Sequence, residues 1–228
     1  PGPNVTSDVT DSEEEIEETV LMFNETQRKR ALDAPWVFGN TAETTLALSL
    51  VIAPLLLRLY QRGWQIIVKE APGIPHTVPT LDTPLAAVQQ AARSYVTTTN
   101  QMLQTALADL PMDATPADAA RIVGHVFDAA DVRARQLAVT EAHRAAEAGK
   151  LAALLVTGTA QWGVWRVQSA KPCSHCLALH GRRIPLGEAF FVKGDTMQDA
   201  TGKALKLDYG DVHTPPLHPL CRCILQVE

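Results

Sequence analysis

The four cysteines of this 228-residue chain fall into two tight pairs, and these pairs constrain the fold more than any other feature. Cys173 and Cys176 are separated by two residues in PCSHC, and Cys221 and Cys223 by one residue in PLHPLCRC. A C-x2-C segment can turn back so that both sulfurs point to one place, and the side chains of an extended C-x-C segment share one face. Two such pairs predict four thiolate ligands for one structural zinc ion.

Other interpretations of the cysteines stay open. His218 has metal-ligand spacing with Cys221 in HPLC, so His218 can replace Cys223 in a site of three cysteines and one histidine. Disulfides are an alternative, but no export signal is recognisable and a reducing cytosol is expected. A redox use of Cys173 and Cys176 needs the motif at the start of a helix that follows a strand in a βαβ unit, and ALHGRRIPLG (178–187) does not resemble a helix.

Patterns typical of catalytic sites are absent from the sequence. A catalytic zinc keeps one coordination position open beside a general base, whereas four thiolates fill the coordination sphere. Glu141 and His143 are two residues apart on an expected helix, so they point to different sides. The chain has no Gly-rich phosphate loop, no G-x-S-x-G elbow and no H-E-x-x-H motif. We therefore expect a protein that is not an enzyme.

The N-terminal third divides into two segments by composition. Residues 1–24 hold seven carboxylates and no Lys or Arg, which predicts an acidic disordered tail. Residues 25–84 hold the apolar run LALSLVIAPLLL (46–57), followed by a proline-rich arm. The run stops at Arg58 after about a dozen residues, and crossing a bilayer takes about 20. We expect a core or subunit-contact helix there, and no membrane.

The remaining two segments predict helices first and strands second. Residues 85–150 have apolar side chains at helical spacing, and Thr115, Pro116 and Asp118 form a helix start, with the end expected at Gly149. In residues 151–228, GVWRVQ, GRRIPL and CILQV are candidate strands, and residues 191–211 read as a loop or loose hairpin. The predicted class is α+β, a mainly helical body with a small C-terminal β module stapled by the metal site.

Four stretches in this order resemble the phage Mu F-like minor head proteins, also called phage head morphogenesis domains. They are VTEAHRAAEAG, GVWRV, C-x2-C-x4-G-x3-P and PPLHPLCRC, and the resemblance covers residues 85–228. Two places depart from the family pattern: Val139 stands where relatives have Arg, and residues 169–171 lack the usual acidic residue. The positions that carry the motif are Cys173, Cys176, Gly181, Pro216, His218, Pro219, Cys221, Arg222 and Cys223.

The resemblance implies a virion component, made in the host cytoplasm, that acts at the portal vertex in head morphogenesis, DNA packaging or DNA delivery. Its expected partners are the portal protein and the major capsid protein, with several copies around the vertex. A zinc-ribbon nucleic-acid binder is one alternative, but residues 171–228 carry seven Lys or Arg against six Asp or Glu, which leaves room for weak DNA contact at most. A thiol oxidoreductase using Cys173 and Cys176 is the other.

Overall fold

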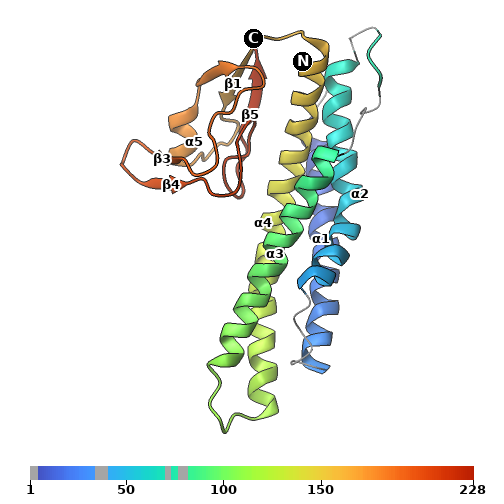
Figure 1. Cartoon of the computed structure of the whole chain (residues 1–228), viewed down its shortest axis with the longest axis vertical. Helices are drawn as coiled ribbons and strands as arrows, with labels where there is room; N and C mark the ends of the chain where they lie inside the picture. Colours follow the sequence, from blue (N-terminus) through green and yellow to red (C-terminus); the bar gives the residue numbers. More distant parts are fainter. Residues whose placement is uncertain (1–4, 34–40, 70–72, 77–81) are drawn as a thin grey trace. The chain divides into compact units, whose positions relative to one another are not determined.

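The computed structural model describes residues 5–33, 41–69, 73–76 and 82–228. These residues form an α+β fold, in which four long helices precede a small β module (Figure 1). The helices are α1 (Val5–Asp33), α2 (Thr41–Val68), α3 (Asp82–Ala108), α4 (Pro116–Thr157) and the short α5 (Ser174–Leu179). The strands are β1 (Trp162–Arg166), β2 (Arg183–Pro185), β3 (Thr196–Gln198), β4 (Ala204–Lys206) and β5 (Ile224–Val227).

The chain divides into two compact units that differ from the segments expected from composition. The first unit contains residues 1–57 and 81–141, and the second contains residues 58–80 and 142–228. Helices α2 and α4 each contribute residues to both units. The β module therefore shares its unit with parts of two long helices, and it does not begin at residue 151.

Helix α1 replaces the disordered tail that the acidic composition predicted for residues 1–24. Its buried positions recur at spacings of three and four, and Ile16 and Val20 are fully buried while Glu14 and Glu18 remain exposed. Glu14, Glu15 and Glu18 thus lie on the solvent face of an amphipathic helix, whereas Glu13 is buried on its inner face. The overall composition of the segment does not reveal this narrow apolar stripe, because most of its residues are polar.

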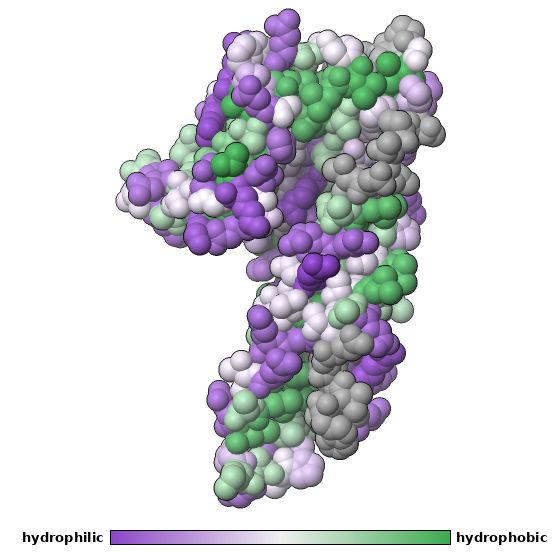
Figure 2. Space-filling view, in the orientation of Figure 1, coloured by the Kyte–Doolittle hydropathy of each residue, from purple (hydrophilic) through white to green (hydrophobic). Residues whose placement is uncertain are grey.

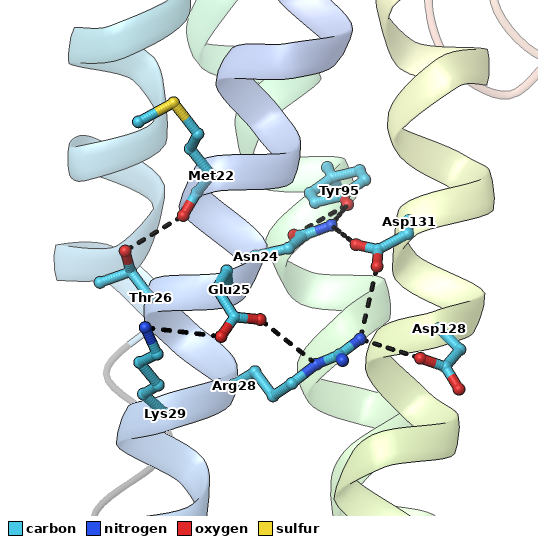
Figure 3. A network of polar contacts seen from close by, with 9 residues as sticks. All are labelled: Met22, Asn24, Glu25, Thr26, Arg28, Lys29, Tyr95, Asp128 and Asp131. Carbon is cyan, nitrogen blue, oxygen red and sulfur yellow. Dashed lines mark hydrogen bonds and ion pairs between the residues drawn. The ribbon is translucent and has the colours of Figure 1, made fainter.

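A polar cluster joins α1 to the other helices of the first unit (Figure 3). The Asn24 side-chain amide donates to the Tyr95 hydroxyl at 2.8 Å and to the Asp131 carboxylate at 2.7 Å. The Tyr95 hydroxyl donates to the Ala130 carbonyl at 2.8 Å. Because Asn24 and Tyr95 are buried, these bonds fix the position of α1 against α3 and α4.

Arg28 extends this cluster toward the surface. Its guanidinium lies 2.9 Å from the Asp128 carboxylate and 3.4 Å from that of Asp131, and its charge lies over the ring of Phe127. Asp128 and Asp131 belong to α4, so this ion pair joins α1 to α4 within the first unit.

Helix α2 is longer than the apolar run from which it was predicted. It continues through Pro54 and past Arg58 to Val68, so the expectation that the segment is too short to cross a bilayer rested on a wrong end. Among the described residues, α2 is the one helix long and apolar enough to cross a membrane, by length and composition only. Leu48 and Ile52 of this helix are fully buried, whereas Leu46, Leu50 and Val51 are exposed.

Helix α4 begins as predicted and ends later than predicted. The Asp118 amide donates to the Thr115 hydroxyl, and the Asp118 carboxylate accepts from the Thr115 amide, which is a reciprocal cap. The helix passes Gly149 and stops at Thr157, where Gly158 adopts a left-handed φ of 60°.

Gly149 does not end helix α4. It lies where α2 and α4 cross closely. A Cβ on Gly149 would lie 2.0 Å from the Tyr60 carbonyl oxygen of α2, and a Cβ on Gly63 would lie 2.0 Å from the Ala146 carbonyl oxygen of α4. Only glycine fits at either position without moving a backbone. The crossing anchors this stretch of α4 within the second unit.

The sheet of the second unit confirms the three predicted strands. Its order is β2-β1-β5, all antiparallel, with Trp165 opposite Leu225. Strands β3 and β4 form the separate hairpin expected within residues 191–211. Trp165 is fully buried and meets the Phe190 ring edge-on, with the centroids 5.1 Å apart. The cysteines belong to the same core cluster.

Candidate metal centre

The structure brings both cysteine pairs and His218 together. Cys173, Cys176 and His218 form one group, and Cys176, Cys221 and Cys223 form another, with all ligand atoms in a group within 4.8 Å of one another. The Cys176 and Cys221 sulfurs are 3.6 Å apart. Two sulfurs bound to one tetrahedral ion at about 2.3 Å would be about 3.8 Å apart, so this spacing fits a shared metal ion.

The first pair is positioned by the start of helix α5. Cys173 is the N-cap residue, and its sulfur accepts a hydrogen bond from the Cys176 amide at 3.3 Å. One turn of helix then brings Cys176 to the same side as Cys173. A short helix therefore begins at the motif, but it ends at Leu179, so most of ALHGRRIPLG (178–187) is not helical, as predicted. However, β1 and β2, on either side of α5, are antiparallel and give no βαβ unit.

The second pair is positioned by a tight turn in HPLC. The Cys221 amide donates to the His218 carbonyl at 3.1 Å, and Leu220 adopts a left-handed φ of 61°. This turn brings the His218 side chain and the Cys221 sulfur to the same region. Cys223 is the residue immediately before β5, where the chain becomes extended.

The hydrogen bonds of His218 identify its metal-binding nitrogen. Nδ1 lies 2.8 Å from the Pro219 carbonyl, which can only accept, so Nδ1 carries the proton. Nε2 is then free to bind a metal ion, and it lies 3.0 Å from the Cys173 sulfur and 3.2 Å from that of Cys176. His218 thus occupies a ligand position beside the four cysteines, so five donors are available for four positions.

The thiols interact strongly with one another. The hydrogen bond to Cys221 raises the pKa of Cys176 above its ordinary value, and a further bond to Cys223 and burial add to this effect. Hydrogen bonds from Cys176 and Cys223 lower the pKa of Cys221. The cluster therefore favours a thiolate at Cys221 while its neighbour keeps a proton. A divalent cation would displace that proton and stabilise further thiolates.

His175 lies in the C-x2-C segment but serves another purpose. Its Nε2 lies 2.9 Å from the Lys203 carbonyl, and the Ser174 hydroxyl donates to the Asp199 carboxylate. Hydrogen bonds from Ser174 and then Thr201 hold the pKa of Asp199 well below its usual range. These contacts fasten the β3–β4 hairpin to α5, so His175 supports the site without being a ligand.

Two polar residues of α4 next to the site escaped the sequence analysis. His143 Nε2 bonds the Cys223 carbonyl, and the Glu147 carboxylate accepts the Leu225 amide at 2.9 Å. Glu141 and His143 had been rejected as a catalytic pair, and His143 is indeed engaged with the backbone before β5. Polar residues spaced by four in an Ala-rich helix were the available signal.

Comparison of the chain with protein-family models, with curated proteins and with solved structures gave no match. The resemblance to Mu F-like minor head proteins thus stays an expectation from the motifs.

Proposed function

We propose that this chain is a structural protein whose C-terminal module is held together by one zinc ion. The observation that carries the proposal is the burial of the donor cluster: Cys176, Cys221 and Cys223 are 3%, 2% and 2% exposed. Cys173 and His218 are half-buried beside them, and a tetrahedral ion that takes four protein donors has no open position for a substrate. Thiolate and imidazole donors in tetrahedral spacing favour zinc over harder cations.

The role that we propose for this protein is that of a minor head protein of a tailed phage, located at the portal vertex. The support is that five of the motif residues gather at the candidate metal centre, namely Cys173, Cys176, His218, Cys221 and Cys223. The near balance of charge in residues 171–228 argues against nucleic acid as the main partner. We propose the portal protein or the major capsid protein as the partner.

The candidate contact surface lies on α2. Leu46, Leu50 and Val51 are large apolar side chains that remain exposed on this helix, and apolar patches reach the surface over the helices in Figure 2. Exposed apolar surface of this kind is typical of protein contacts. Leu55, in the same apolar run, is buried and belongs to the core.

The zinc proposal is tested by elemental analysis of freshly purified, reduced protein. We expect about one zinc per chain, and loss of β-module structure when the ion is chelated, because such small modules need the metal to fold. Cys176→Ser should weaken zinc binding more than His218→Ala does, since Cys176 belongs to both donor groups and His218 to one. A metal-free wild-type protein with an intact β module would refute the proposal.

The assembly role is tested by copurification with phage heads. The double variant Leu46→Glu, Leu50→Glu should be lost from heads, while its zinc content and circular dichroism stay unchanged. Met112→Glu is the matched control, because Met112 is a fully exposed apolar residue outside α2. If the double variant enters heads as the wild type does, this surface is not the contact. Absence of the wild-type chain from heads would remove the phage assignment.

A further inference from the structure

Strand β5 is the edge strand that follows the C-x-C pair, and within the part of the chain that the structure describes, one of its edges faces no other strand. The sheet order β2-β1-β5 leaves the outer edge of β5 to be satisfied by other groups. The Leu225 amide and the Cys223 carbonyl belong to this edge, since their partners are side chains of α4. The position of the C-x-C segment therefore depends on a helix as well as on β1.

The helix side chains match the spacing of the strand. His143 and Glu147 are four residues apart, about 6.0 Å along a helix, so both lie on one face of α4, and the Cys223 carbonyl and the Leu225 amide, two residues apart in an extended chain, point to the same side. His143 meets the first backbone group and Glu147 the second. Because a carbonyl can only accept, His143 donates through Nε2–H.

His143 and Glu147 form a polar face of α4 that is buried. Burial of polar side chains costs free energy of folding. His143 is 8% exposed and Glu147 is 2% exposed. The other carboxylate oxygen of Glu147 pairs with Lys150, which is also largely buried. Apolar side chains at such positions often give equal or greater stability than a buried ion pair. Positioning of the strand is a role that apolar side chains could not fill.

The helix that carries this face is itself held in place. Gly63 and Gly149 allow α2 and α4 to touch backbone to backbone, and neither helix can slide without a clash. Ala146, between His143 and Glu147, provides one of the contacting carbonyls. The donor and the acceptor offered to β5 are therefore fixed before the cysteines meet a metal ion.

We propose that His143 and Glu147 are positioning residues of the metal centre, which hold Cys221 and Cys223 within reach of Cys173 and Cys176. This inference rests on the proposed function in one respect, namely that the cluster binds a metal ion. Residues that orient metal ligands in this way commonly change metal affinity by about 10- to 100-fold when they are removed.

The test uses the full chain, with Co²⁺ as a spectroscopic probe and a competing chelator to measure affinity. His143→Leu removes the donor and His143→Gln keeps one. Glu147→Leu and Glu147→Gln are compared in a Lys150→Met background, so that no cation is left buried alone. We expect the Leu variants to bind Co²⁺ about 10- to 100-fold more weakly with altered ligand-field bands, and the Gln variants to stay close to wild type.

Leu154→Ala is the control for a purely structural effect. Leu154 is a buried residue of α4 whose side chain has no polar group to offer the strand. This variant should lower the free energy of unfolding and keep the wild-type Co²⁺ spectrum. Wild-type affinity and spectrum in the Leu variants would overturn the positioning role alone. A wild-type chain that binds no Co²⁺ would overturn both this proposal and the zinc proposal.

Discussion

Leu220 shows how the backbone of one residue shapes the metal centre. Its φ of 61° lies in the left-handed region, where a leucine costs about 1–2 kcal/mol. Its side chain is half exposed, so little packing offsets that cost. The turn that directs His218 and Cys221 is thus formed by a residue poorly suited to it.

Leu220→Gly and Leu220→Asn should leave the free energy of unfolding unchanged or raise it, because both residues tolerate a left-handed backbone. Leu220→Val should lower it by about 1 kcal/mol or more, since β-branched side chains tolerate this region least. Chemical denaturation of the zinc-loaded protein measures the difference. Leu177→Gly is the control: this exposed leucine lies in α5, where glycine should cost about 0.5–1 kcal/mol. Equal effects at both positions would contradict the argument.

The residues of the candidate site were predictable to the extent that their chemistry is local. Paired cysteines and the HPLC spacing indicate ligands by themselves, so the four cysteines and His218 were found. His143 and Glu147 were not, because their partners are backbone groups about 80 residues away. Nothing in the sequence near α4 indicates that an edge strand will need a donor and an acceptor there.

At the scale of elements, the crossing of α2 and α4 allows a sharp test. Gly63→Ala or Gly149→Ala should lower the free energy of unfolding by about 1–3 kcal/mol or more, because the added Cβ would overlap a backbone carbonyl. Gly124→Ala is the matched control on α4, since nothing lies within 4 Å of its added Cβ. Because alanine favours a helix more than glycine does, that variant should be more stable than wild type by up to about 1 kcal/mol. A neutral Gly149→Ala would mean that the helices do not approach so closely.

The buried cluster of α1, α3 and α4 predicts a dependence on alkaline pH. Burial raises the pKa of Tyr95 from its ordinary value of 10.0 to about 12. The folded state therefore favours the neutral phenol. This contribution to stability is complete below pH 10 and is lost as the pH rises toward 12.

Tyr95→Phe should be less stable than wild type at pH 8, by about 1–3 kcal/mol, because the buried Asn24 amide and the Ala130 carbonyl each lose a hydrogen bond. Between pH 10 and 12 the wild type should lose more stability than Tyr95→Phe, which has no ionisable group there. Urea denaturation at several pH values gives both curves. Parallel curves would show that Tyr95 does not ionise on unfolding in this range.

Elements with strong local signals were predictable, and their ends were not. The reciprocal cap of α4 and the strands GVWRVQ and CILQV have such signals, so they were found. The extension of α2 to Val68 and of α4 past Gly149 depends on the packing of one helix against the other. The sequence alone does not distinguish a glycine that ends a helix from a glycine that lets a neighbouring helix approach closely.

For the molecule as a whole, the N-terminal segment is part of the fold. Deletion of residues 1–24 should lower the free energy of unfolding by about 3–6 kcal/mol, because Ile16 and Val20 are fully buried and each contributes about 1.5–3 kcal/mol. The triple variant Glu14→Gln, Glu15→Gln, Glu18→Gln is the control, since it changes charge on exposed positions only. The melting temperatures of the deletion variant and of the triple variant are each compared with that of the wild type. An unchanged melting temperature after the deletion would instead support the prediction of a disordered tail.

Helices α2 and α4 each belong to both compact units, and this limits how such a chain can evolve. Recombination exchanges continuous stretches of sequence, yet no single cut separates residues 58–80 and 142–228 from the rest. A fragment beginning at residue 151 would carry every cysteine but would lack His143, Glu147 and the glycines of the crossing. The cysteine module and the helices that support it must therefore be inherited together, and substitutions in one should be compensated in the other.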